Sequence, residues 1–301
     1  MPASLITLIG PGITSEHVSD LERALNAAFD QANAGLAPTE PRHASALADL
    51  EIRQWRFDAR VGDVRAALDR FVSQTRSQGI EVLITPAHLA DAGPRLIVTD
   101  VDSTLIRDEV IELLADHAGA RDEVAAITES AMRGELDFTQ SLVQRVSALA
   151  GLEASVHEEV LRALRLSAGV ENLCATLKKS GDYIGVVSGG FIEIVEPLAA
   201  SLGIDFARAN RLKVLDGKLT GEVTGTVVDR EVKAQTLRAW ANECGVPLER
   251  TIAIGVGAND LSMLATAGLG VAFNAKPVVA QEADVAIVGE RLDVVLAVLG
   301  S

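Results

Sequence analysis

The segment from Asp100 to Thr104 carries two carboxylates two residues apart, directly after the apolar run 96–99. Two anions at the end of a buried strand repel each other and are costly to remove from water, so a positive charge is expected between them. A magnesium ion would supply it and would allow a phosphate ester to bind as substrate, with Asp100 as nucleophile and Asp102 as proton carrier. On its own the pattern also fits a solvated turn or a helix cap. A phosphate site is therefore expected only if other segments of the chain support it.

Three more segments carry polar groups that could act on a phosphate. The segment 188–190, Ser-Gly-Gly, follows an apolar run and could offer backbone N–H groups to a phosphate, or form an ordinary glycine-rich turn. Lys233 lies near the start of a predicted helix, where its ammonium could neutralise phosphate charge or face solvent. The segment 255–263 places Asn259 and Asp260 at the start of another predicted helix, where both residue types are also common caps.

The composition favours an α/β protein whose core is aliphatic. Of the 301 residues, 48% are hydrophobic and only 3% aromatic, as suits a parallel sheet with aliphatic strands. The net charge of −15 argues against nucleic acid and anionic membranes as partners. We find no apolar run that could span a bilayer and no signal-peptide pattern, and the two cysteines lack metal-ligand spacing. We therefore expect a cytoplasmic protein, with a homodimer as the default oligomer.

Residues 1–90 are expected to form a separate, small α+β domain. Strands are predicted over 5–9, 50–57 and 81–85, and helices over 16–32 and 64–77. A loop is expected over 34–43, a fourth strand is expected near 44–49, and 86–94 reads as a linker. The order of strands and helices resembles that of an ACT domain. Two roles remain open for it, a ligand sensor or a docking and dimerisation domain without a ligand.

The second domain is expected over 95–301, with aliphatic strands that alternate with helices. The strands are predicted at 96–99, 184–187, 251–254, 269–272 and 285–288. This pattern predicts a doubly wound parallel sheet, whose ligands bind at the carboxyl ends of the strands. A helical insert over 107–168, with breaks near Gly119, Gly134 and Gly151, is too long for a simple crossover and should form a cap. Asp216-Gly217 predicts a hairpin between strands at 212–215 and 218–223.

In this order and on these elements, the four chemical segments resemble the haloacid dehalogenase superfamily of phosphotransferases. The details at 100–104, 188–191, 257–261 and 270–277 resemble the phosphoserine phosphatases within it, from about Arg95 to the C-terminus. The resemblance implies hydrolysis of L-phosphoserine to L-serine and phosphate, the last step of serine biosynthesis, with Mg²⁺ as cofactor. The alternatives are a phosphatase for another small phosphomonoester and a catalytically silent regulator that binds serine or phosphoserine.

The resemblance also assigns roles to single residues. Asp100 would form an aspartyl-phosphate, Asp102 would move protons, and Ser188 and Lys233 would complete the catalytic set. The substrate-binding residues that it implies are Glu109, Phe138, Arg145, Ser188, Gly189, Gly190 and Asn259. Arg145 would pair with the substrate carboxylate and Glu109 with its ammonium, although without the resemblance a surface ion pair is the simpler interpretation.

One position departs from the family pattern. The resemblance implies that Asp100, Asp102 and a further aspartate hold the metal, and this chain has Val256 where the family has that aspartate. Valine offers no oxygen, while Mg²⁺ demands nearly octahedral oxygen coordination. Asp260, four residues on, is the candidate replacement ligand. We therefore expect a weakened magnesium site.

Overall fold

The computed structural model describes residues 3–29, 37–38, 50–132 and 135–299. The chain divides into two compact units, Met1–Arg95 together with Arg291–Ser301, and Leu96–Glu290. The second unit therefore ends before the last residues of the chain, and the C-terminal segment joins the first unit. This differs from the predicted boundaries, which placed 95–301 in one domain.

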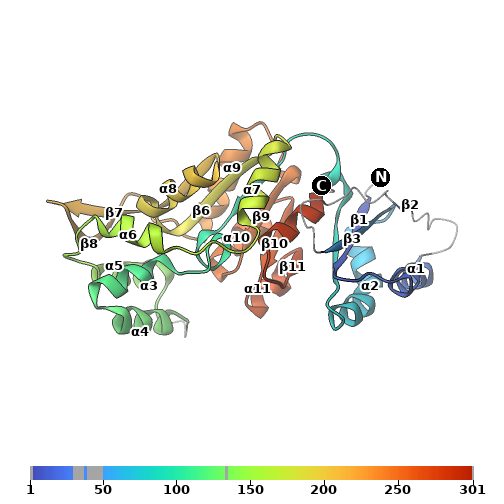
Figure 1. Ribbon diagram of the computed structural model, residues 1–301, viewed down its shortest axis with the longest axis horizontal. Helices are drawn as coiled ribbons and strands as arrows, with labels where there is room; N and C mark the ends of the chain where they lie inside the picture. The colour runs from blue at the N-terminus through green and yellow to red at the C-terminus, as the bar shows by residue number, and fades with distance from the viewer. Residues whose placement is uncertain (1–2, 30–36, 39–49, 133–134, 300–301) are drawn as a thin grey trace. The chain divides into compact units, whose positions relative to one another are not determined.

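The first unit contains a four-stranded antiparallel sheet with two helices (Figure 1). Its elements are β1 (Ser4–Gly10), α1 (Ser15–Ala28), β2 (Ala37–Pro38), β3 (Glu51–Phe57), α2 (Val61–Arg76) and β4 (Glu81–Pro86). The strand order is β2-β3-β1-β4. The predicted loop over 34–43 is wrong at Ala37–Pro38, which pairs with β3, and the strand expected near 44–49 lies outside the described residues.

Both faces of this sheet are covered. Ile6 and Leu8 of β1 are fully buried in one core with Leu21 of α1 and Leu68 of α2. The opposite face belongs with the C-terminal 3₁₀ segment Leu292–Leu299, whose side chains are nearly all buried. Gln54 of β3 donates from Nε2 to the Ala297 carbonyl over 2.6 Å. The hydrophobic pattern of the C-terminal segment indicated burial, but not which sheet would bury it.

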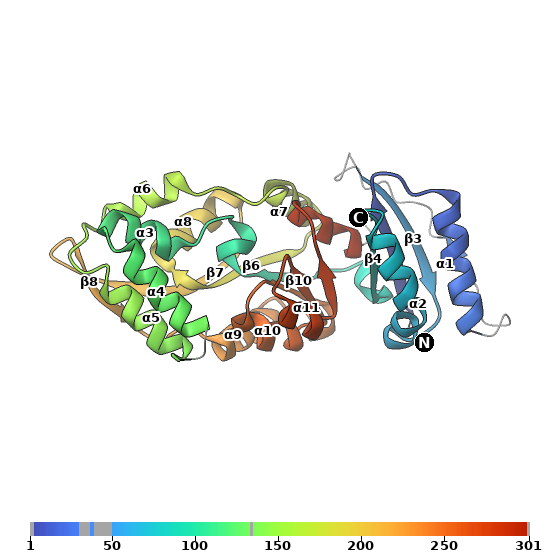
Figure 2. The ribbon, with the colours of Figure 1, turned by 90° about the horizontal axis from the view of Figure 1, so that it is seen from below.

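The second unit is a doubly wound α/β fold, as predicted. Its strands are β5 (Leu96–Thr99), β6 (Tyr183–Phe191), β7 (Phe206–Leu215), β8 (Lys218–Thr224), β9 (Thr251–Gly255), β10 (Leu269–Phe273) and β11 (Val285–Ile287). They form one sheet in the order β11-β10-β9-β5-β6-β7-β8, parallel except for β8. The covering helices are α7 (Val170–Lys179), α8 (Ile192–Leu202), α9 (Arg230–Glu243), α10 (Leu261–Thr266) and α11 (Pro277–Glu282). Helices α7 and α8 lie on one face, and α9, α10 and α11 on the other (Figure 2).

A helical cap is inserted between β5 and α7, as expected from the length of the insert. It consists of α3 (Val110–Ala118), α4 (Arg121–Met132), α5 (Phe138–Ser147) and α6 (Val156–Ala163). Gly119 and Gly151 have φ of 65° and 90° and separate helices as predicted, while Gly134 lies outside the described residues. The two chain segments that join the cap to the sheet pair with each other at Ile106 and Leu166.

An ion pair reinforces this junction. The Asp108 carboxylate accepts hydrogen bonds from the Arg165 backbone N–H, Nε and Nη2 at 2.8, 3.0 and 2.6 Å. These bonds hold the pKa of Asp108 below its usual range despite the opposing effect of burial. The junction is therefore held by both backbone pairing and charge.

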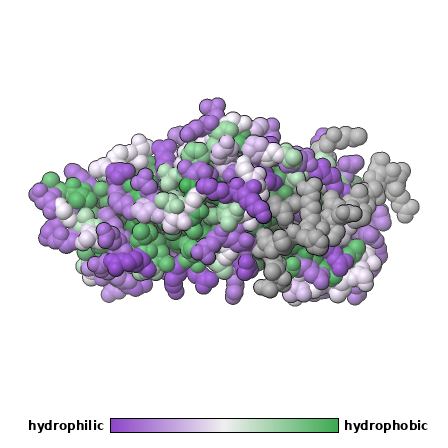
Figure 3. Space-filling model, turned by 45° about the horizontal axis from the view of Figure 1, so that its top comes forward, coloured by the Kyte–Doolittle hydropathy of each residue, from purple (hydrophilic) through white to green (hydrophobic). Residues whose placement is uncertain are grey.

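The β7–β8 hairpin supports the cap from a second side. Asp216 and Gly217 both have positive φ, so the turn is the tight type that the Asp-Gly dipeptide predicts. Gly151 donates to the Leu219 carbonyl, and Ala154 to the Gly217 carbonyl, both over 2.8 Å. Apolar side chains are visible at the end of the molecule where this hairpin protrudes (Figure 3), and Leu215 at its tip is 65% exposed.

None of the helices in the described part of the chain combines the length and apolarity needed to cross a bilayer.

Candidate active site

The predicted site residues of the second unit come together at the carboxyl ends of its strands. Asp100 directly follows β5, and its backbone N–H donates to the Ile254 carbonyl of β9 over 2.9 Å. Ser188 lies in β6, the neighbour of β5 on the other side. Lys233 lies in the first turns of α9, and Asp260 directly precedes α10. The strand predicted at 184–187 is longer in the structure. It continues through Gly189 and Gly190 to Phe191, and α8 begins at the next residue.

Lys233 is buried between two carboxylates. Its Nζ lies 2.7 Å from Asp100 Oδ1 and 2.7 Å from Asp260 Oδ1. The side chains of Lys233 and Asp260 are fully buried, and that of Asp100 is 7% exposed. The sequence indicated Lys233 as a partner for phosphate, but not that its ammonium pairs with two aspartates.

This arrangement shifts the ionisation of its members. Burial disfavours the Lys233 ammonium, but the charges of Asp100 and Asp260 outweigh burial and raise the pKa of Lys233. Burial and the neighbouring Asp260 raise the pKa of Asp100, while Lys233 opposes the rise. A buried cluster with more acids than bases is stabilised by a further positive charge. The sequence predicted a positive charge beside Asp100.

Asp102 is held in place by the cap and by Ser188. Its Oδ1 accepts from the Val110 backbone N–H over 2.8 Å, and its Oδ2 accepts from Ser188 Oγ over 3.0 Å. Burial raises the pKa of Asp102, and these two hydrogen bonds oppose the rise. The turn after Asp102 needs a left-handed residue, and Ser103 has φ of 55° there. A raised pKa brings a carboxyl group closer to the range in which it can give and take a proton.

The two glycines after Ser188 have close neighbours. A Cβ on Gly190 would lie 2.9 Å from Asp102 Oδ2 and 3.0 Å from Ser188 Oγ. A Cβ on Gly189 would lie 3.0 Å from Cζ of Phe138, so the aromatic ring of the cap lies directly over this loop. The structure thereby brings Phe138 of α5 to the loop that the sequence assigned to phosphate.

Glu109 and Arg145 face the same region without pairing directly. Glu109 Oε1 accepts from Ser103 Oγ over 2.7 Å, and Arg145 Nε donates to the Ser141 carbonyl over 3.3 Å. Removal from water and the charge of Asp102 raise the pKa of Glu109 to about 7, with Arg145 opposing, although the residue still reaches solvent. Burial lowers the pKa of Arg145, and the charges of Glu109 and Asp102 oppose this. Within the described residues, no ion pair within 4.0 Å joins Glu109 to Arg145.

Both carboxylate oxygens of Asp260 accept hydrogen bonds from other groups of the protein. Its Oδ2 accepts from the backbone N–H groups of Val256 and Gly257 at 3.0 and 2.9 Å, in addition to the bond from Lys233 to Oδ1. The half-buried Val256 contributes no side-chain oxygen. Asn259 lies against Gly257 and makes no side-chain hydrogen bond to other described residues.

The donor set for a cation is correspondingly small. No group of three or more His, Cys, Asp or Glu side chains that could hold a metal occurs among the residues described. The remaining oxygens are the second carboxylate oxygen of Asp100 and the backbone carbonyl of Asp102. Mg²⁺ can be bound by one or two protein groups when waters and substrate phosphate complete the shell, so these residues could hold it.

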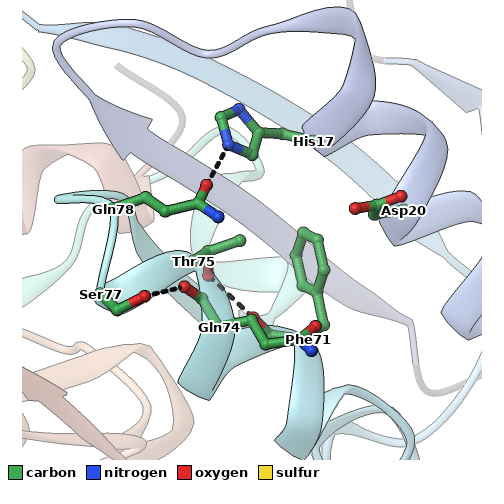
Figure 4. A pocket seen from close by; sticks show the side chains of 7 residues that line it. All are labelled: His17, Asp20, Phe71, Gln74, Thr75, Ser77 and Gln78. Atoms are coloured by element: carbon green, nitrogen blue, oxygen red, sulfur yellow. Dashed lines mark hydrogen bonds between the residues drawn. The ribbon is translucent and has the colours of Figure 1, made fainter.

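A cavity of about 280 Å³ lies elsewhere, between α1 and α2 of the first unit. It is lined by His17, Asp20, Phe71, Gln74, Thr75, Ser77 and Gln78 (Figure 4). The Thr14 backbone N–H donates to His17 Nδ1, so the proton of a neutral imidazole is on Nε2, which bonds to Gln78 Oε1. None of the residues that the sequence assigned to catalysis lines this cavity.

Comparison with known proteins identifies the family to which the second unit is similar. The family model of haloacid dehalogenase-like hydrolases matches residues 97–265, more than half of the chain. The chain belongs to this hydrolase family. The match spans β5 to α10 and includes the cap, so the haloacid dehalogenase-like unit carries every predicted site residue.

Individual relatives are similar as well. A phosphoserine phosphatase of Streptomyces coelicolor is 55% identical over 228 residues, which are 76% of this chain and 56% of that protein. A phosphoserine phosphatase of Streptococcus thermophilus is 50% identical over 68% of this chain and 95% of its own length. The chain thus spans little more than half of the first relative and nearly all of the second. The unliganded structure of a probable phosphoserine phosphatase from Vibrio cholerae is 33% identical, with a TM-score of 0.73 over 98% of this chain and 86% of that one.

Replacement of Lys233 by methionine should leave Asp100 and Asp260 buried without their counter-ion. Loss of one partner of a buried ion pair typically costs about 3–5 kcal/mol, so we expect the free energy of unfolding of Lys233→Met to fall by that amount. Urea denaturation measures it. The matched control is Lys179→Met on the surface of α7, which should change the value by less than about 0.5 kcal/mol. Equal effects of the two substitutions would contradict the importance of this ion pair.

Glu109 should make the free energy of unfolding depend on pH. Its pKa of about 7 lies above the ordinary value of 4.5, so the folded protein binds this proton more tightly than the unfolded chain. Ionisation of Glu109 between these values therefore destabilises the fold, and the loss is complete above pH 7. Glu109→Gln should be more stable relative to the parent at pH 8 than at pH 5, as measured by thermal unfolding without metal or substrate.

The control is Glu123→Gln on the exposed surface of α4, for which no such gain at pH 8 is expected. A constant difference between Glu109→Gln and the parent from pH 5 to pH 8 would show that the Glu109 carboxylate is not destabilised in the fold.

Proposed function

We propose that this chain hydrolyses L-phosphoserine to L-serine and phosphate through an aspartyl-phosphate on Asp100. The observation that carries the proposal is that two groups converge on one region. Asp100, Asp102, Ser188 and Lys233 come from the sheet side, and Glu109, Phe138 and Arg145 come from the cap side. The names of similar proteins support the same substrate.

The first chemical step transfers the phosphoryl group to the protein. A carboxylate oxygen of Asp100 attacks phosphorus while the bond from phosphorus to the seryl oxygen breaks. Asp102, whose pKa is raised by burial, gives a proton to the leaving seryl oxygen. In the second step a water attacks phosphorus, Asp102 accepts a proton from that water, and the bond to Asp100 breaks to release phosphate.

The groups around the phosphoryl oxygens supply hydrogen bonds and charge. Ser188 Oγ lies 3.0 Å from Asp102, and the neighbouring Gly189 amide lies on the same loop. Lys233 provides the positive charge at Asp100. Donors that are fixed before the reaction stabilise developing negative charge without reorganisation.

The cap would recognise the amino-acid part of the substrate. Arg145 and Glu109 carry opposite charges, face the same region and are not paired with each other, so a zwitterion with its own carboxylate and ammonium complements them. The planar guanidinium suits a carboxylate. Phe138 lies over Gly189 and would exclude water from the phosphoryl group.

Magnesium would be held by Asp100 and by the backbone carbonyl of Asp102, and when bound it would spread the charge of the phosphoryl oxygens. Val256 removes one ligand, and Asp260 could replace it only by breaking its bonds to Lys233, Val256 and Gly257. We therefore assign Asp260 to the support of Lys233 and of the loop, and we propose that the site binds magnesium weakly.

The N-terminal unit has the strand order and helix placement of an ACT-like domain, and we propose that it is one. Its role as a sensor or as a docking domain, a homodimeric assembly and a cytoplasmic location stay predictions.

Arg145→Ala tests the substrate. The loss of a hydrogen-bonded charge should lower kcat/KM for phosphoserine at least about tenfold. Hydrolysis of p-nitrophenyl phosphate, which has no carboxylate or ammonium, should be unchanged. Gln144→Ala, the adjacent exposed residue of α5, is the control. Unchanged turnover of phosphoserine would instead favour a phosphatase for another small phosphomonoester.

Val256→Asp tests the metal site. Restoring a carboxylate at this position should lower the magnesium concentration for half-maximal phosphoserine turnover by on the order of 10–100-fold. Addition of magnesium should also raise the Tm of Val256→Asp more than that of the parent. Val256→Leu, which adds no oxygen, should behave like the parent.

Two other outcomes are distinguishable from this one. The same magnesium response in the parent and in Val256→Asp would contradict a weakened site. Activity in Val256→Asp alone, with magnesium in excess, would favour a silent binding protein.

A further inference from the structure

Asn210 lies in β7, outside every motif that the sequence indicated, and is only 2% exposed. Its amide makes two hydrogen bonds to backbone groups of different segments. Oδ1 accepts from the Val228 N–H over 2.8 Å, and Nδ2 donates to the Gly189 carbonyl over 2.8 Å. A backbone N–H only donates and a carbonyl only accepts, so these partners fix which end of the amide is which.

The bond to Gly189 determines the direction of the Ser188 hydroxyl. The peptide between Gly189 and Gly190 is planar, so holding its oxygen also orients its N–H. That N–H donates to Ser188 Oγ over 2.7 Å. With a lone pair of Ser188 Oγ engaged by Gly190, its hydrogen is directed to Asp102 Oδ2 at 3.0 Å.

The bond to Val228 determines where α9 begins. Val228 precedes Asp229, whose side chain caps α9 by accepting two backbone N–H bonds. The Asp229 carbonyl accepts from the Lys233 N–H over 3.0 Å, so Lys233 lies one helical turn after Asp229, the residue that follows Val228. The Val228 backbone also approaches Gly189, since a Cβ on Gly189 would lie 3.9 Å from the Val228 carbonyl oxygen.

We infer that Asn210 is a positioning residue that sets the distance between the two phosphate-binding groups of the proposed function, the Ser188–Gly189 segment of β6 and Lys233. It touches neither the substrate nor the reacting atoms. It acts through the Gly189–Gly190 peptide on one side and the cap of α9 on the other. The inference rests on the proposed phosphatase function and adds to it a residue for which the sequence gave no signal.

Two variants separate the two bonds. Asn210→Asp keeps an acceptor for Val228 but loses the donor to Gly189, and Asn210→Ala loses both. The control is Arg208→Gln, two residues earlier on β7. Arg208 Nη1 donates to Thr236 Oγ1 over 2.9 Å, so this change breaks another link from β7 to α9 without touching Gly189 or Val228.

The readouts are the affinities for inorganic phosphate and for L-serine, each measured by calorimetry with magnesium in excess, and kcat for phosphoserine. We expect both Asn210 variants to lose phosphate affinity and kcat by on the order of ten- to a hundredfold, the usual effect of displacing a binding group. Affinity for L-serine, which the cap would bind, should be unchanged. Arg208→Gln should resemble the parent in all three measurements.

Unchanged phosphate affinity in both Asn210 variants would overturn the inference. Equal losses for phosphate and L-serine would do so too, and so would variants that fail to fold, because Asn210 would then hold the fold and not the spacing of two groups. A parent chain that neither binds phosphate nor hydrolyses phosphoserine would instead refute the proposed function, and the inference with it.

Discussion

The site depends on one buried ammonium. Lys233 contacts Asp100 and Asp260 at 2.7 Å and is wholly removed from water, as is Asp260. A buried charge is stable only when it is paired and hydrogen-bonded. The fold must therefore bring Lys233, Asp100 and Asp260 into contact with one another. Because they follow β5, begin α9 and precede α10, this requirement fixes the positions of three segments that are distant in sequence.

The same constraint bears on the loop at Val256, through the second oxygen of Asp260. The second oxygen of Asp260 binds the backbone of Val256 and Gly257, so the loop keeps its shape whether or not residue 256 carries a carboxylate. The backbone of the loop at Val256 is therefore held by Asp260 and not by the side chain of residue 256.

A few hydrogen bonds connect the cap to the residues that follow β5. Glu109 begins the cap yet bonds to Ser103 of the loop after β5, and the Val110 N–H bonds to Asp102. The first turn of the cap is thereby coupled to the proposed proton donor. The ion pair between Asp108 and Arg165 secures the same junction. Under the proposed function, recognition of the substrate by the cap and proton transfer at the sheet would thus be connected by adjacent residues.

The sequence predicted the elements better than their long-range contacts. Aliphatic runs located the strands of the second unit, and Asp216-Gly217 located its hairpin, because both signals are local. Local patterns did not indicate that Phe206–Arg211 extends β7 into the main sheet, or that the C-terminal segment joins the first unit. The pairing of Lys233 with two aspartates and the anchoring by Asn210 depend on which strands become neighbours. The motifs nevertheless identified the residues that meet at the sheet edge, since chemistry restricts residue types there.

The central claim is that Asp100 carries the phosphoryl group during turnover. The direct measurement is mass spectrometry of peptides from protein quenched in acid while it hydrolyses phosphoserine with magnesium in excess. The account predicts a phosphoryl group on the peptide that contains Asp100, at the Asp100 side chain, and its absence in Asp100→Asn. Turnover without any phosphorylated peptide, or with the group on another residue, would contradict it.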